Sequence, residues 1–309
     1  MDRKTTDFTH VATIVARASS SLQHIGDTLE SVMGEAASEK AGPVRLLSGS
    51  GDFTAIEQAA TLEDPKPVRE SLEAAFDGTA DICVSPSHSR RKALLICDMD
   101  STIIQQECLD ELADFAGLKA EISAITERAM RGELEFEAAL RERVGKLKGL
   151  ELSALDRCYR ERITLMPGAR TLVATMKARG ARCMLVSGGF TYFTARVAEA
   201  AGFDAHRGNT LLDDGNTLTG TVGEPILGRQ AKLAALREEA ATLGLDLTAT
   251  LAMGEGANDL AMIEAAGLGI AYRAKPVVAA ASDCAIKVTD LTAALYFQGY
   301  TDSEIVWKH

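Results

Sequence analysis

The sequence lacks a long apolar run. No stretch approaches the roughly 18 consecutive apolar residues that a membrane-spanning helix needs. The first twenty residues are too polar and too interrupted for a signal peptide. We therefore expect a cytoplasmic protein that has no membrane partner.

Cysteine and histidine are sparse, and neither forms a ligand pattern. The six cysteines include no C-x-x-C spacing, and the five histidines include no pair at helical spacing. We therefore expect reduced, buried thiols rather than a disulfide framework or a zinc site.

Positive charge is also scarce. The formal net charge is −11 at pH 7, whereas proteins that bind phosphate backbones concentrate Lys and Arg. Nucleic acid is therefore not an expected partner, and an anionic substrate would need a local basic pocket or a metal ion. The one compact basic stretch, SRRK at residues 89–92, lies in a Ser/Pro-rich segment, which predicts a solvated linker.

The length indicates two domains. A chain of 309 residues exceeds the roughly 100 to 200 residues of a typical domain. In residues 1–86 we expect a strand at 8–17, a helix at 18–34, strands at 43–48 and 52–57, a helix at 66–76 and a strand at 80–84. This order fits a small ferredoxin-like α+β domain. Its expected role is regulation, as in small amino-acid-binding modules, or alternatively folding or dimerisation, which would make the protein a homodimer.

Residues 93–309 show a different pattern, in which short apolar runs alternate with amphipathic helices. The expected strands are 93–97, 182–187, 248–253, 268–272 and 285–288, and the expected helices are 168–179, 190–201, 229–243 and 258–266. Continuous apolar strands separated by helices indicate an α/β fold with a doubly wound parallel sheet that is covered on both faces. Ligands bind such sheets at the carboxyl ends of the strands.

Two segments interrupt this alternation. Residues from about 105 to 165 contain only helical patterns, which is far more than a crossover between neighbouring strands requires. We expect a helical cap inserted over the strand ends. Residues 209–222 place turn residues between alternating runs and predict a β-hairpin.

The first strand of the sheet ends in two acids. Asp98 and Asp100 follow the apolar run ALLIC and precede Ser101 and Thr102. Two neighbouring carboxylates repel each other unless a positive charge joins them, and Mg²⁺ commonly takes one or two carboxylates with water and a substrate phosphate. For an isolated D-x-D-S-T stretch, capping of the following helix is the alternative.

The next strand ends also carry polar groups. The second strand leads to Ser187, Gly188 and Gly189, whose backbone N–H groups and following helix favour an anion. The third leads to the stretch GEGANDL at 254–260, with acids at 255 and 259. Each signal alone is compatible with turn or capping chemistry, but together they predict a site at one edge of the sheet.

The order of these motifs resembles that of the haloacid dehalogenase superfamily of phosphohydrolases. More narrowly, CDMDSTIIQQECLDELADFAG, VSGGFT and GANDLAMIEAAGLGIAYRAKP resemble the phosphoserine phosphatase family, and the similarity extends over most of residues 93–290. The resemblance implies that Asp98 attacks phosphorus to form an aspartyl-phosphate, that Asp100 moves the proton to and from the substrate and water oxygens, and that O-phospho-L-serine is hydrolysed in the last step of serine biosynthesis.

The resemblance also implies the ligand set. Mg²⁺ would be held by the Asp98 carboxylate, the Asp100 backbone carbonyl and the acids at 255 and 259. The phosphoryl group would be bound by Ser187, Gly188 and Lys232, with Asn258 completing the substrate site. In the cap, the substrate ammonium would bind Glu107 and its carboxylate Arg143, while Met130 and Phe136 would close the pocket.

The third motif departs from the family pattern. Family members carry G-D-G, whereas this chain has Gly254-Glu255-Gly256. The longer side chain would shift the carboxylate or the ion by up to about 1 Å, and Mg²⁺ tolerates such shifts poorly. The alternatives are a site adapted to Glu255, a weakened or binding-only protein, another small-phosphomonoester phosphatase or phosphotransferase, and a non-catalytic amino-acid sensor.

Overall fold

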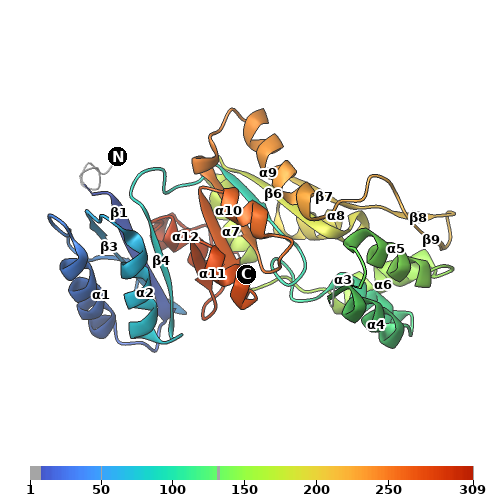
Figure 1. Cartoon of the computed structure of the whole chain (residues 1–309), viewed down its shortest axis with the longest axis horizontal. Helices are drawn as coiled ribbons and strands as arrows, with labels where there is room; N and C mark the ends of the chain where they lie inside the picture. Colours follow the sequence, from blue (N-terminus) through green and yellow to red (C-terminus); the bar gives the residue numbers. More distant parts are fainter. Residues whose placement is uncertain (1–7, 50, 131–132, 309) are drawn as a thin grey trace.

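The computed structural model of the protein describes residues 8–49, 51–130 and 133–308. A sheet of ten strands runs through them (Figure 1). In sheet order the strands are β2 (Arg45–Ser48), β3 (Phe53–Ala60), β1 (His10–Arg17), β4 (Ala80–Pro86), β12 (Cys284–Ile286), β11 (Leu268–Tyr272), β10 (Thr250–Gly254), β5 (Leu94–Cys97), β6 (Arg182–Phe190) and β7 (Ala205–Asn209).

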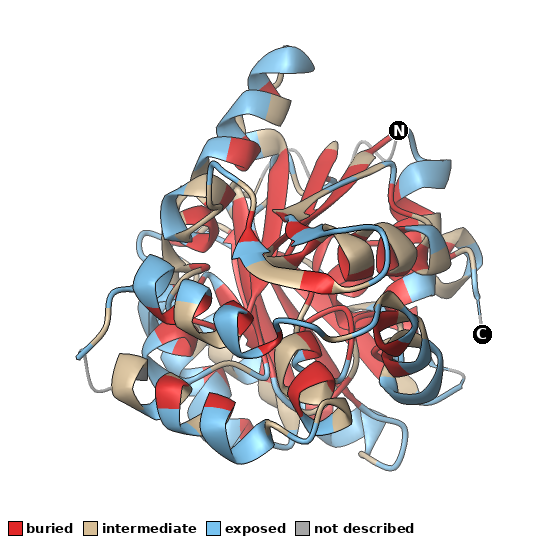
Figure 2. Ribbon diagram, turned by 90° about the vertical axis from the view of Figure 1, so that its right-hand side faces the viewer, coloured by how far each residue is buried: buried red, intermediate tan, exposed pale blue. Residues whose placement is uncertain are grey.

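The strands from β12 to β7 are parallel, as the apolar runs predict, and β5 lies between β10 and β6. All four residues of β5 are buried, because helices cover both faces. Leu95 and Cys97 pack with α7 (Ala169–Ala178), α8 (Thr191–Ala201) and α12 (Ala293–Phe297), while Leu94 and Ile96 pack with α9 (Arg229–Thr242) and α10 (Leu260–Ala265). Figure 2 shows the buried strands between helices whose outer faces are exposed. The doubly wound α/β fold is confirmed.

The N-terminal strands form the antiparallel half of the sheet. The order β1, α1 (Leu22–Ala36), β2, β3, α2 (Pro65–Phe76), β4 matches the six expected elements to within a few residues. One face of these strands packs under α1 and α2. The other face, which includes Val15 and Cys83, belongs to the same core cluster as α12. Both faces of this half-sheet are therefore covered within the chain.

Residues 89–92 connect β4 to β5, and the expectation of a solvated linker was wrong for Arg90 and Lys92, whereas Ser89 and Arg91 are exposed. Arg90 forms an ion pair of 2.8 Å with the buried Glu57 and donates to the Phe297 carbonyl at 3.1 Å. Arg91 binds both carboxylate oxygens of Glu304, and Lys92 is buried with its ammonium 2.7 Å from the Thr248 carbonyl. Arg90 thus joins the two halves of the sheet, whereas Arg91 and Lys92 bind an acid and carbonyls of the C-terminal half.

The predicted cap and hairpin are also observed. The cap consists of α3 (Cys108–Phe115), α4 (Lys119–Met130), α5 (Phe136–Lys146) and α6 (Leu152–Arg162), and the hairpin of β8 (Leu211–Asp213) and β9 (Leu218–Val222). Both lie at the opposite end of the molecule from the N-terminal strands (Figure 1).

Several short elements escape the sequence patterns: β7, α11 (Pro276–Ala281), α12, and the 3-10 turns η1 (Leu247–Ala249) and η2 (Asp302–Glu304). Within the described ranges, none of the helices combines the length and the apolar character that a bilayer crossing requires.

Candidate active site

Asp98 stands at the carboxyl end of β5. Its N–H continues the sheet by donating to the Met253 carbonyl at 2.9 Å, and the Met99 N–H then turns back to its Oδ1 at 2.8 Å. Three further N–H groups, those of residues 102–104, share the Met99 carbonyl in a tight turn. This turn ends the strand and leaves Asp98 only 3% exposed at the sheet edge.

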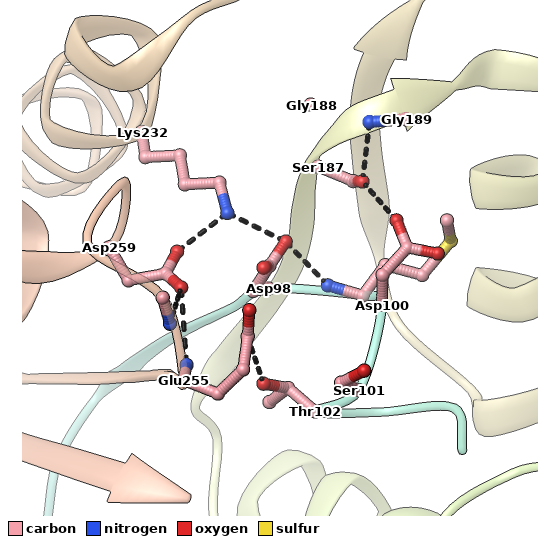
Figure 3. A network of polar contacts seen from close by, with 12 residues as sticks. Asp98, Asp100, Ser101, Thr102, Ser187, Gly188, Gly189, Lys232, Glu255 and Asp259 are labelled. Atoms are coloured by element: carbon pink, nitrogen blue, oxygen red, sulfur yellow. Dashed lines mark hydrogen bonds and ion pairs between the residues drawn. The ribbon is translucent and has the colours of Figure 1, made fainter. Parts of the chain in front are cut away.

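Lys232 joins the acids of two strand ends. Its ammonium lies 2.7 Å from Asp98 Oδ1 and 2.6 Å from Asp259 Oδ1, and all three residues are buried (Figure 3). The second oxygen of Asp259 accepts the N–H groups of Glu255 at 3.1 Å and Gly256 at 3.0 Å. A Cβ at Gly254 would lie 2.3 Å from the Asp259 carboxyl carbon, so this close approach requires glycine.

Asp100 lies beside the second strand end. Its Oδ1 accepts the Cys108 N–H at 2.9 Å and its Oδ2 accepts the Ser187 hydroxyl at 3.1 Å. The Ser187 Oγ accepts the Gly189 N–H at 2.8 Å (Figure 3). The two acids of the D-x-D motif therefore have different environments: an ammonium beside Asp98, and neutral donors on Asp100.

Glu255 turns toward Thr102, whose hydroxyl donates to its Oε2 at 3.0 Å. One carboxylate oxygen from each of Asp98, Glu255 and Asp259 lies within 4.8 Å of the other two. These oxygen donors suit a hard divalent cation. The Asp100 side chain is not part of this cluster, because it accepts the Cys108 N–H and the Ser187 hydroxyl. Its backbone carbonyl is the atom expected to bind a cation.

The pKa values of the acids reflect crowding around one ammonium. Burial, followed by the charge of Asp259, raises the pKa of Asp98 well above its usual range, although Lys232 opposes the shift. Burial also raises the pKa of Asp100 and of Glu255. For Lys232, burial favours the neutral amine, but Asp98 and Asp259 outweigh it and raise its pKa. Burial and the proximity of the other acids thus disfavour the ionised carboxylates of Asp98 and Glu255, and a cation bound between Asp98, Glu255 and Asp259 would offset this cost.

The expected substrate residues lie in the cap and at its mouth. Glu107 accepts the Ser101 hydroxyl at 2.7 Å. Although solvent reaches this side chain, partial burial and then the charge of Asp100 raise its pKa to about 7. Burial lowers the pKa of Arg143 on α5, against the opposing charges of Asp110 and Glu107. The charge of Glu107 therefore acts on Arg143, so the two side chains are close enough for one ligand with an ammonium and a carboxylate to bind both.

The remaining expected residues differ in what the structure describes. The Phe136 ring lies over Gly188 in the Ser187–Gly189 loop and over Gly228 at the start of α9, since a Cβ at Gly188 would be 3.4 Å and one at Gly228 3.5 Å from it. Asn258 lies in the Gly254–Asp259 loop, with its Oδ1 against Gly256. Met130 ends α4, but its side chain lies outside the described residues.

Sequence reasoning assigned no role to Thr102 or to the Cys108 N–H, although each contacts a site residue. Thr102 directly follows the acid pair and could have been proposed from that position. The Cys108 N–H had no signal, because the turn that brings it to Asp100 is a tertiary feature.

Comparison with known proteins agrees with this arrangement. A family model described as haloacid dehalogenase-like hydrolase matches residues 95–264. The chain belongs to this hydrolase family. The match begins in β5 and ends in α10, so it spans the acids, the Ser187–Gly189 loop, the cap and Lys232.

Relatives within the hydrolase family extend the similarity to the N-terminal strands. A protein of Schizosaccharomyces pombe named probable phosphoserine phosphatase is 38% identical over 265 residues, which is 85% of this chain and 89% of that protein. A phosphoserine phosphatase of Streptomyces coelicolor is 43% identical over 256 residues, or 82% of this chain, and the match spans 62% of that longer relative. The solved structure of a probable phosphoserine phosphatase from Vibrio cholerae has a TM-score of 0.74 at 31% identity and covers 96% of this chain and 90% of that one.

Proposed function

We propose that this protein hydrolyses O-phospho-L-serine to L-serine and phosphate through an aspartyl-phosphate, with Mg²⁺, as the last step of serine biosynthesis. The observation that carries the proposal is the meeting of Asp98, Asp100 and Lys232 at one sheet edge beneath a cap that holds Glu107 and Arg143. The names of the relatives support the choice of substrate.

Asp98 is the nucleophile in this proposal. One of its carboxylate oxygens forms a bond to phosphorus while the bond from phosphorus to the serine oxygen breaks. Lys232 lies 2.7 Å from Asp98, so its charge also lies close to the transferring phosphoryl oxygens. Ser187 and the backbone of Gly188 supply donors from the opposite side.

Asp100 is the general acid and base. Burial raises its pKa, which favours a carboxylic acid that can give its proton to the departing serine oxygen. The resulting carboxylate then takes a proton from the water that attacks the aspartyl-phosphate. Phosphate leaves, and both aspartates return to their first state.

The cation site fits Mg²⁺ by its donor set. The ion would be held by the carboxylates of Asp98, Glu255 and Asp259 with the Asp100 backbone carbonyl, and it would supply positive charge to the phosphoryl oxygens. The longer Glu255 finds a donor in the Thr102 hydroxyl at 3.0 Å. This contact supports a site that is adapted to glutamate.

Phosphoserine selection is assigned to the cap. The substrate carries one ammonium and one carboxylate besides the phosphoryl group, and Glu107 and Arg143 have the complementary charges. Phe136, which lies over Gly188 and Gly228, closes the pocket above the phosphoryl group.

The deciding experiment measures phosphate release from L-phosphoserine as Mg²⁺ is titrated, with Glu255→Asp in parallel. We expect both proteins to turn over at similar rates. Activity of Glu255→Asp alone would identify the chain as a weakened or binding-only form. Faster turnover of other phosphomonoesters, tested as a panel with alcohol acceptors, would replace phosphoserine as the substrate.

A further inference from the structure

β6 is irregular at Ser187–Gly189, which the proposed function makes the phosphate loop. Paired with β7, it advances four residues, from Val186 to Phe190, while β7 advances two, from Arg207 to Asn209. The extra residues lie at Ser187–Gly189. A bulge of this kind leaves backbone groups outside the ladder and changes the direction of the neighbouring side chains and amides.

Asn209 fills this bulge from the end of β7. Its Nδ2 donates to the Gly188 carbonyl at 2.7 Å, and its side chain is buried, at 1% exposure. Its Oδ1 accepts the Leu227 N–H at 2.7 Å, and Nδ2 also lies 3.3 Å from the Leu227 carbonyl. One side-chain amide therefore connects the backbone of the phosphate loop with that of a second segment.

The second segment leads to the phosphate-binding lysine. Leu227 precedes Gly228, the N-cap of α9, and the first turns of α9 carry Lys232. The Phe136 ring packs over Gly188 and Gly228, the two glycines beside these connections. The adjacent Gly208 allows β7 to approach closely, because a Cβ there would lie 3.1 Å from the Gly189 carbonyl.

We infer that Asn209 is a positioning residue for phosphoryl transfer. It holds the Gly188 peptide in a fixed orientation relative to Lys232, so that loop amides and ammonium reach the same phosphoryl group. The inference rests on the proposed function, since that function makes both elements phosphoryl ligands. Misplacement of such a ligand by about 1 Å costs about 100-fold in rate.

Two variants separate the loss of the bridge from the effect of introducing a charge. Asn209→Asp has nearly the same shape and keeps the acceptor for Leu227, but it loses the donor to Gly188. Asn209→Ser carries a side chain too short to bridge both segments and introduces no charge. Should Asn209→Asp fail to fold, Asn209→Ser still tests the inference.

Gln298→Glu is the matched control. The Gln298 amide is also buried, at 1% exposure, and connects two backbone segments by accepting the Lys92 N–H at 3.0 Å and donating to the Ala294 carbonyl at 2.9 Å. Gln298 is the C-cap of α12 and contacts the segment that leads from β4 to β5. Its loss changes stability without touching the phosphate loop.

The readouts are kcat/KM for L-phosphoserine, affinity for orthovanadate as a phosphoryl mimic, inhibition by L-serine and the melting temperature. For both Asn209 variants we expect kcat/KM to fall about 10- to 100-fold and vanadate affinity to fall about 10-fold or more. L-serine inhibition should stay within about two-fold of the original, because serine lacks the phosphoryl group and is read by the cap.

A drop in melting temperature with unchanged vanadate affinity, as expected for Gln298→Glu, would overturn the inference and leave the proposed function intact. A wild-type protein that releases no phosphate would overturn the proposed function, and vanadate affinity alone would then decide the role of Asn209. A wild-type protein that also fails to bind vanadate would overturn both.

Discussion

Replacing Lys232 by methionine removes the ammonium that lies between two buried carboxylates. The side chains of Lys232, Asp98 and Asp259 are 3%, 5% and 0% exposed, so water cannot take over the lost contacts at 2.7 and 2.6 Å. Removing one partner of a buried ion pair costs about 3 to 5 kcal/mol. Because two pairs share this lysine, we expect Lys232→Met to lower the free energy of unfolding by at least about 3 kcal/mol at pH 7 without divalent cations. We also expect the variant to lose turnover.

The loss should depend on pH in a defined direction. The pKa of Asp98 is already raised by burial, and Lys232 opposes that shift, so the variant raises it further. A folded-state acid with a raised pKa binds protons that the unfolded chain releases, and stability therefore falls as pH rises from the unfolded value of about 4 to the folded one. Lys232→Met should thus recover part of its lost stability as the pH is lowered from 7 to 5.

The assay is urea unfolding followed by circular dichroism at both pH values, with Lys92→Met as the control. Lys92 is also buried, but its ammonium donates to the Thr248 and Gly267 carbonyls, which do not titrate. Its loss should cost about 2 kcal/mol and change little with pH. A loss below about 1 kcal/mol for Lys232→Met, equal at both pH values, would refute the reasoning.

Three other predictions concern the cap and the junction with the N-terminal strands. Arg143→Ala should lower kcat/KM for phosphoserine about 100-fold but that for phosphoethanolamine, which lacks the carboxylate, far less; equal losses would exclude the assigned role. Because Glu107 has a pKa of about 7, the KM for phosphoserine should fall as pH rises through that value and Glu107 ionises, and Glu107→Gln should abolish this dependence; a dependence that survives in the variant belongs to another group. Asp81 on β4 accepts the N–H groups of residues 287–289 and the Thr289 hydroxyl, so Asp81→Ala should cost about 3 kcal/mol of stability and leave kcat unchanged, whereas a loss of activity in the folded variant would connect this junction to the site.

The elements with strong periodicity were predictable, and the short ones were not. β5 and β11 agree with the apolar runs to within one residue, and the cap helices appear where only helical spacing occurs. β7, with the sequence AHRGN, has no apolar run because it lies at the sheet edge. α12 has only five residues, too few to establish a helical period.

The basic stretch at 89–92 shows how a local pattern misleads. Three consecutive cations beside Ser and Pro usually stay in water. Here Glu57 and Glu304, together with backbone carbonyls from distant segments, surround these side chains. Glu57 and the Phe297 carbonyl, which meet at Arg90, come from the two halves of the sheet that join where β4 pairs with β12 and Cys83 faces Cys284. That contact has no sequence signature.

The sequence by itself determined the fold class, the cap and the strand ends at which Asp98, Asp100, Ser187 and Asp259 lie. It could do so because consecutive parallel strands bring their carboxyl ends to one edge whatever the details of packing. Only the tertiary structure decided which atoms meet: Lys232 between two acids, Thr102 on Glu255, and Asn209 between the phosphate loop and α9. These contacts join segments far apart in the chain, and their distances follow from the packing of whole elements, which no local pattern encodes.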